Sequence, residues 1–301
     1  MNKKTCIIVL LIICRIDVYA YRQPLLNFGL TSFLDGGPIR PNPGIYWEEY
    51  FLYYHAHKFR GGNGQLLSNH TPLNSFFIIN ELIYQAPIEI LGGEPGIDFF
   101  LPTVPYSHLA PNNFGIRDSG KGIGDLYLGL LLQFNPIKHH DRTILVHRIE
   151  LPFSSPTGKA RPGVVFNPGN GFFFFNPYWA GTLYFTDDWA ISWRIHYLWN
   201  AENKKEKTQA GQATNMNFTT EYQVIENLWA GINGYLIYQF TDDKRCGISI
   251  PNSKERVYSL GPGALYKVND DFYLFFNLYF EFKAQNRAQG VEANFRLFMH
   301  F

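Results

Sequence analysis

The chain has 301 residues; 17% are aromatic, including 27 Phe and 19 Tyr, and only 17% are charged. A soluble domain is usually about a quarter charged, and a helical membrane protein needs about twenty consecutive apolar residues per span, which this chain lacks. The net charge of +1 and the scattered acids and bases give no indication of a nucleic-acid partner. Membrane β-barrels combine many aromatics with a low mean hydropathy, as here, because apolar and polar residues alternate along their strands.

The first twenty residues predict a secretory signal peptide. Lys3 and Lys4 supply a positive start, residues 6–14 form an apolar core, and Val18-Tyr19-Ala20 resembles a cleavage site. A lipoprotein signal ending at Cys14 is the alternative, but Ile13 stands where a small residue is normally required. Cleavage after Ala20 would leave a single cysteine and no internal disulfide, which suits the bacterial outer membrane.

Residues 21–44 predict an irregular N-terminal arm. They are rich in Gly, Pro and Asn, with Gly36-Gly37-Pro38 and Pro41-Asn42-Pro43, and they follow neither the helical nor the strand period. We expect the arm to fill part of the lumen of a barrel formed by residues 45–301.

The barrel segment is predicted from strands in which polar and apolar residues alternate. In residues 189–200 the odd positions are Trp, Ile or Tyr, whereas the even ones include Ser192, Arg194, His196 and Asn200. This period of two places successive side chains on opposite faces of a strand. The segments run about ten to twelve residues, near the nine to eleven that a tilted strand needs to cross the hydrocarbon. Because backbone groups in lipid must all be paired, such strands close into an antiparallel barrel.

We expect about twelve strands, an even number, with ten to fourteen left open because the first three segments and the sixth alternate poorly. Short turns at 186–188 and 269–271 are expected on the periplasmic side, and the polar stretches 201–213 and 241–255 as outer loops. The predicted strand centres are Phe51, Ile79, Phe99, Leu130, Val146, Pro177, Ile195, Thr220, Gly234, Gly261, Phe276 and Phe295.

The last segment carries the most specific signal of the outer membrane. Apolar residues occupy every second position back from the terminal Phe301 through Met299 and Leu297, while Arg296 and Asn294 fall on the other face. A terminal aromatic with this alternation resembles the C-terminal signature by which outer-membrane proteins are recognised for assembly. We therefore expect outer-membrane lipids and the barrel assembly machinery as partners.

Motifs that could carry catalysis or bind a metal are weak. The glycine-rich string at 115–122 nearly matches a phosphate-binding loop, but Gly122 replaces the magnesium-binding Ser or Thr, and a strand follows where a helix should. His139-His140-Asp141 has no second His or Cys cluster close in sequence, which indicates a solvated turn. A barrel hydrolase is a further hypothesis, which needs a Ser with a His neighbour near a rim; His147 and Ser192 are present, but nothing in the sequence pairs them. We predict no enzyme, cofactor or metal.

The polar faces of the strands predict the inner wall of the barrel. Opposite charges lie two residues apart on one face, as in Arg148 with Glu150 and Glu281 with Lys283, so they could form ion pairs in a narrow lumen or line a pathway. The inward-facing Tyr residues suit amphipathic or aromatic solutes. The candidate lumen-lining residues are Arg148, Glu150, Arg194, His196, Glu221, Tyr235, Tyr273, Asn277, Tyr279, Glu281, Lys283, Glu292 and Arg296.

Several segments resemble the meta-pathway phenol degradation family of outer-membrane proteins, including its SphA-like transporters. They are Gly44-Ile-Tyr-Trp-Glu-Glu-Tyr-Phe-Leu-Tyr-Tyr, Asp118-Ser-Gly-Lys-Gly-Ile-Gly-Asp-Leu, Leu151-Pro-Phe-Ser-Ser-Pro-Thr-Gly, Gly231-Ile-Asn-Gly-Tyr, Gln239-Phe-Thr-Asp-Asp, Leu260-Gly-Pro-Gly and Phe280-Glu-Phe-Lys-Ala-Gln-Asn-Arg-Ala-Gln-Gly. The resemblance implies a barrel channel or transporter for small hydrophobic or aromatic compounds, without catalytic residues. A non-conducting surface barrel used for binding or adhesion is the alternative.

Overall fold

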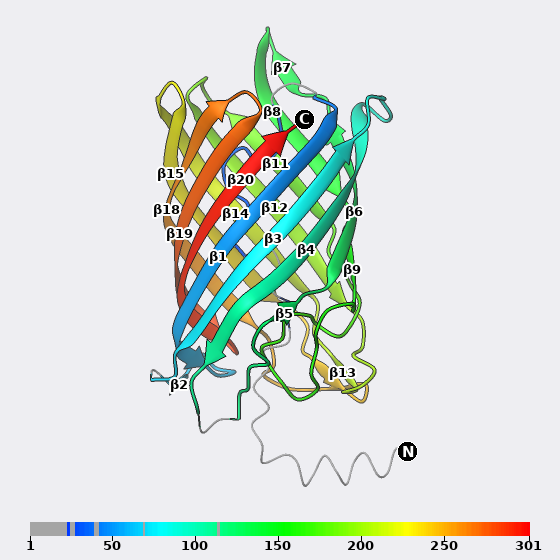
Figure 1. The fold of residues 1–301 in the computed structure, drawn as a ribbon, viewed down its shortest axis with the longest axis vertical. Coiled ribbons are helices and arrows are strands. Elements are labelled where there is room, and N and C mark those ends of the chain that lie inside the picture. Colours follow the sequence, from blue (N-terminus) through cyan, green and yellow to red (C-terminus); the bar gives the residue numbers. More distant parts are fainter. Residues whose placement is uncertain (1–22, 25–27, 39–41, 69, 113–114) are drawn as a thin grey trace.

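The computed structural model describes residues 23–24, 28–38, 42–68, 70–112 and 115–301. Twelve strand positions form a closed antiparallel barrel (Figure 1). Eleven predicted centres fall within strands and the sixth, Pro177, on the break between β10 and β11. In chain order the positions are β1 (Gly44–Arg60), β3 (Leu73–Gln85), β4 (Gly93–Leu109), β6 (Leu126–Phe134), β8 with β9 (Arg142–Glu150 and Phe153–Ser155), β10 with β11 (Phe174–Phe175 and Tyr178–Tyr184), β12 (Trp189–Asn200), β14 (Ala213–Ile225), β15 (Leu228–Gln239), β18 (Arg256–Asn269), β19 (Phe272–Gln285) and β20 (Ala288–His300).

The barrel closes where its last strand pairs with its first. β20 lies antiparallel to β1, with a register that runs from Tyr46 opposite His300 to Phe59 opposite Ala288. Phe301 extends this ladder, because its N–H donates to the carbonyl of Ile45 at 2.8 Å and its carbonyl accepts from the N–H of Ile45 at 3.2 Å. Closure leaves neither of these strands with an unpaired edge, as a membrane barrel requires.

The strand period sorts side chains between an outer and an inner face. In β19, Phe276 and Phe280 are each 50% exposed on the outside, while Asn277 between them is fully buried. β15 repeats the pattern, with Ile232 exposed and Asn233 buried. In a closed barrel the exposed apolar face is the one that contacts lipid, so the buried polar face belongs to the lumen.

Two strand positions are broken by prolines at neighbouring places in the wall. Leu151-Pro152 separates β8 from β9, and Asn176-Pro177 separates β10 from β11. Proline has no N–H to donate, so it interrupts the ladder. The Asn176 N–H still donates to the Pro152 carbonyl at 2.9 Å, which keeps the two positions in register. These prolines explain why the sixth segment alternates poorly in the sequence.

The connections differ in length at the two ends of the barrel (Figure 1). Residues 186–188 and 269–271 form short turns at one end, where Phe301 also lies, while 201–213 and 241–255 lie at the other end. We call these the turn end and the loop end.

Among the described residues there is no helix long and apolar enough to cross a membrane. The remaining strands are short: β2 (Leu66–Ser68), β5 (Gly122–Ile123) and β7 (Ile137–His139) extend the barrel sheet, and β13 (Thr208–Gln209), β16 (Lys244–Arg245) and β17 (Ile248–Ser249) form a small separate sheet.

Candidate functional site

The inner wall of the barrel is the candidate site, and most of the predicted lining residues are buried on it. Arg148 and Tyr273 are half-buried. The fully buried ones are Glu150, Arg194, His196, Glu221, Tyr235, Asn277, Tyr279, Glu281, Glu292 and Arg296.

Lys283 is the exception, because its side chain is exposed and does not line the lumen. Its backbone has a φ of +52°, which breaks the alternation near the end of β19 and makes Ala284 the next buried residue. The sequence left open whether charges two residues apart form ion pairs. Among the described residues, the buried arginines that form ion pairs do so with acids on other elements.

The sequence reasoning missed the lining residues of the first three strands. Glu48, Tyr50, Glu81 and Asp98 are buried on the inner face. The alternation of polar and apolar residues was obscured in β1 and β3 because the inner faces of these strands also carry Leu and Ile. Every second residue of β1 from position 46 to position 56 is buried, so alternation measured from Tyr46 would have found Glu48 and Tyr50.

The described part of the N-terminal arm lies inside the barrel. Gln23, at the loop end, donates from its backbone N–H to Glu255 Oε1 at 2.8 Å and from Nε2 to Gln239 Oε1 at 2.9 Å. Asn200 Nδ2 donates to Gln23 Oε1 at 3.0 Å. Gly44 begins β1 at the turn end, so the arm passes from one end of the barrel to the other.

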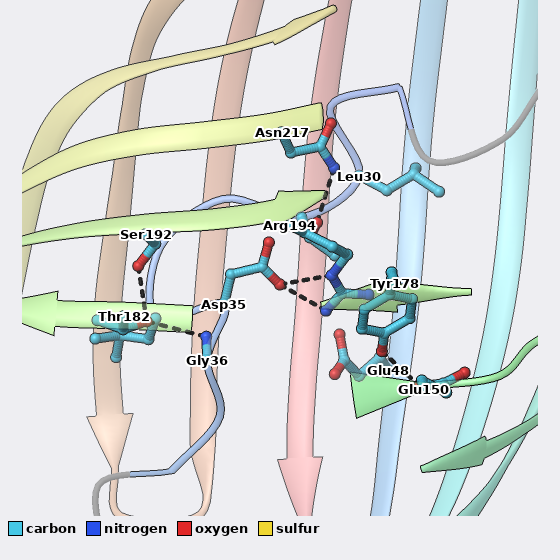
Figure 2. Close-up of polar contacts among 12 residues, drawn as sticks. Leu30, Asp35, Gly36, Glu48, Glu150, Tyr178, Thr182, Ser192, Arg194 and Asn217 are labelled. Carbon is cyan, nitrogen blue, oxygen red and sulfur yellow. Dashed lines mark hydrogen bonds and ion pairs between the residues drawn. The ribbon is translucent and has the colours of Figure 1, made fainter. Parts of the chain in front are cut away.

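A buried ion pair joins the arm to the wall (Figure 2). Asp35 Oδ1 accepts from Arg194 Nε at 2.9 Å and from Nη2 at 2.5 Å, and both side chains are almost fully buried. The Arg194 guanidinium also lies 4.4 Å from the centroid of the Tyr178 ring. Tyr178 in turn donates its hydroxyl to Glu150 Oε2 at 2.5 Å. Asp35 therefore completes a network that is otherwise made of wall residues.

Backbone groups beside Asp35 are bound by the wall as well. The Gly36 N–H donates to Thr182 Oγ1 at 2.9 Å, and Gln133 Nε2 donates to the Gly36 carbonyl at 2.9 Å. The Leu34 N–H donates to Glu221 Oε2 at 3.1 Å. A Cβ at Gly36 would lie 2.2 Å from a wall carbonyl oxygen, so only glycine allows this approach.

The middle of the arm is held at Gly29. Its carbonyl accepts from the Tyr279 hydroxyl at 2.9 Å and from Asn294 Nδ2 at 2.8 Å, and its N–H donates to Asn217 Oδ1 at 3.2 Å. Asn217 also donates from Nδ2 to Thr31 Oγ1 at 2.8 Å. These bonds satisfy the backbone of an irregular segment, which could not otherwise be buried at low cost.

The charges of the wall are paired across strands. Arg296 Nη1 lies 3.2 Å from Glu48 Oε2, and the Tyr50 hydroxyl bonds to both Glu48 and Glu81, at 2.7 and 2.5 Å. Glu81 lies on β3 and Arg296 on β20, so this group spans three adjacent strands around β1. The Tyr50 hydroxyl thus lies between two carboxyl groups of the inner wall and has one hydrogen to donate to them.

Neither a metal site nor the Ser–His pair considered in the sequence is formed by the described residues of the wall. No three His, Cys, Asp or Glu side chains there could hold a metal ion. His147 stacks on Phe134, with ring centroids 4.5 Å apart, whereas Ser192 on another strand donates to Glu221 Oε1 at 2.6 Å. His147 and Ser192 therefore do not form the pair that a hydrolase would need.

A closed antiparallel barrel with an apolar outer face and a polar inner face is the architecture of an outer-membrane β-barrel, and it places the chain in the bacterial outer membrane. Residues 56–297 match the family described as "Putative MetA-pathway of phenol degradation". This match covers most of the chain, so the protein belongs to that family, as the resemblance in the sequence predicted. A search of curated proteins gives no match.

Many solved structures are similar to the chain in fold, among them the following two. An outer membrane channel from Pseudomonas putida has a TM-score of 0.75 and 15% sequence identity, over 87% of this chain and 96% of the other. The β-domain of a Bordetella autotransporter, BrkA, has a TM-score of 0.51 and 11% identity, over 86% of this chain and all of the other. At these identities the likeness concerns the barrel architecture.

Proposed function

We propose that the protein is a channel that passes small hydrophobic or aromatic compounds across the outer membrane. The observation that carries the proposal is what fills the interior of the barrel. A segment of the chain itself, bound largely by side-chain hydrogen bonds, occupies the lumen in place of a continuous apolar core. The family and the Pseudomonas putida structure, which is described as an outer membrane channel, support the proposal.

The solute class follows from the wall. Tyr50, Tyr178, Tyr235 and Tyr279 are buried in the interior, and each presents an apolar ring with a polar tip. Such side chains can pack against the aromatic ring of a solute and can also form hydrogen bonds with its hydroxyl groups. Growth of a deletion strain on single aromatic compounds, with and without the gene restored, tests the proposal; unchanged growth and uptake for every compound would contradict it.

We further propose that the arm acts as a plug. Its supports are the contacts at Gln23, Gly29 and Asp35, which lie along the length of the lumen. The experiment compares the planar-bilayer conductance of the mature protein with that of a variant lacking residues 21–43, which keeps Gly44 at the start of β1. A larger conductance in the shortened protein is expected, and equal conductance would refute the plug.

The same recordings test the alternative hypothesis, a surface barrel that does not conduct and is used for binding or adhesion. The buried ion pairs Arg194–Asp35, Arg287–Glu255 and Arg296–Glu48 are the observations in its favour, since they hold the interior in a fixed arrangement. No conductance in either protein, with both correctly folded, would favour that hypothesis over the channel.

We also propose that the assembly machinery of the outer membrane recognises the C-terminal strand. In the folded barrel the Phe301 side chain is 71% exposed, and its backbone alone completes the ladder to Ile45. The ring is therefore not held by packing within the protein, and recognition before folding is the role that we propose for it.

A further inference from the structure

A cavity lies between the arm and the barrel wall. The arm supplies Phe28 and Leu30, and the wall supplies Leu52 of β1 and Ile79 of β3. Phe166, from the connection between β9 and β10, also lines it. All five are apolar, and the two Phe rings provide flat surfaces suited to an aromatic ligand.

The polar groups at the cavity are almost all paired within the protein. Glu281 accepts from the Tyr54 hydroxyl at 2.7 Å, the Tyr235 hydroxyl at 2.9 Å and the Gly290 N–H at 2.8 Å. Arg287 forms an ion pair with Glu255 at 3.1 Å and lies 4.7 Å from the centroid of the Phe28 ring. Glu281 therefore needs no bond from a ligand.

Glu292 is different from these neighbours. It lines the same cavity and is 3% exposed, and its Oε1 is buried without a hydrogen-bond partner among the described residues. This oxygen lies beside the arm, since a Cβ built at Gly29 would be 2.9 Å from it. A buried acceptor without a donor is unfavourable, and a ligand that brings one donor into the cavity would satisfy it.

We propose that this cavity is a binding site for a small phenol, with the ring between the arm and the wall and the hydroxyl donating to Glu292. The proposal rests on the channel function and deepens it, because it defines which aromatic compounds are selected. A hydrocarbon of the same shape would leave the Glu292 oxygen unpaired. An aromatic carboxylate would place its charge beside the carboxyl groups of Glu281 and Glu292.

The test uses the full-length mature protein in detergent and two compounds of the same shape, p-cresol and p-xylene, with titration calorimetry and a protein-free micelle blank. The wild type is expected to bind p-cresol about tenfold more tightly than p-xylene, which corresponds to one net hydrogen bond. Glu292→Leu is expected to abolish this preference. Equal affinities in the wild type, or an unchanged preference in Glu292→Leu, would overturn the proposal.

Two further variants separate the site from general effects. Thr219→Val removes another buried oxygen without a partner, from a wall residue that does not line the cavity, and should keep the preference for p-cresol. Ile79→Trp fills the cavity and should weaken the binding of both compounds. If Glu292→Leu does not fold, unweakened binding of p-cresol to Ile79→Trp would by itself overturn the site.

The outcome is independent of the transport assays. Uptake of aromatic compounds without selective binding of p-cresol would refute the site and leave the channel. Selective binding in a protein that supports no uptake would refute the channel and leave the site.

Discussion

The ion pair between Asp35 and Arg194 gives the sharpest test of how the arm is held in the lumen. Asp35→Ala removes the carboxylate that accepts two bonds from Arg194, at 2.9 and 2.5 Å, and leaves the guanidinium buried opposite an apolar methyl group. Both side chains are nearly inaccessible, with relative exposures of 6% for Arg194 and 1% for Asp35. The substitution should therefore weaken the docked arm while the strand pairing of the barrel is unchanged.

The expected magnitude follows from these contacts. A hydrogen bond to a charged group contributes about 1.5–3 kcal/mol, and breaking a buried ion pair costs about 3–5 kcal/mol. We take about 3 kcal/mol for the docked state, because Arg194 keeps its contact with the Tyr178 ring. This value corresponds to roughly a hundredfold change in the ratio of undocked to docked arm.

Single-channel recording in planar bilayers measures this change. The open probability of Asp35→Ala should rise by one to two orders of magnitude toward that of the protein lacking residues 21–43. The matched control is Asp270→Ala, which removes the ion pair to Lys267 in the turn between β18 and β19, where the Asp270 side chain is 90% exposed. Exposed ion pairs contribute little, so this control should behave as the wild type does.

The reasoning about the ion pair would be refuted if Asp35→Ala and the wild type gave the same open probability while the shortened protein conducted. The hydrogen bonds at Gly29 and Gln23 would then be sufficient to hold the arm. A change of similar size in the exposed control would show instead that the recordings report general destabilisation.

Three further predictions concern Gly36, Phe301 and the outer face of β19. Gly36→Ala should open the channel as the arm deletion does, because its Cβ would lie 2.2 Å from the Val146 carbonyl oxygen; conductance together with an unchanged heat-modified gel shift checks it. Phe301→Ser should lower the amount of folded protein in the outer membrane severalfold but alter its urea stability by less than about 1 kcal/mol, since the exposed ring makes few contacts; equal yields from pulse-labelled cells would argue against recognition. Phe280→Arg, on the outer face in the middle of β19, should cost about 2–4 kcal/mol of folding stability in lipid, whereas Phe272→Arg at the turn end should cost about 0–1 kcal/mol; equal costs would show that the outer face is not graded by membrane depth.

The sequence alone determined the architecture to a large extent. Alternation depends only on the two-residue repeat of a strand, so it located the strand positions and assigned Arg194, Glu221 and Glu292 to the inner face before any contact was known. It was weakest in β1 and β3, where Leu52 and Ile79 face inward against the arm and make both faces look apolar. A local pattern cannot show that another segment will cover a residue.

The tertiary structure decided which charges meet. One interpretation of the sequence paired Glu281 with Lys283 on its own strand, but Glu281 accepts from Tyr54 and Tyr235 on two other strands. Asp35, in an arm without any period, pairs with Arg194, which lies 159 residues away in the chain. The face of a strand is fixed by local backbone geometry, whereas partners across a lumen depend on how the closed barrel and the arm bring distant residues together.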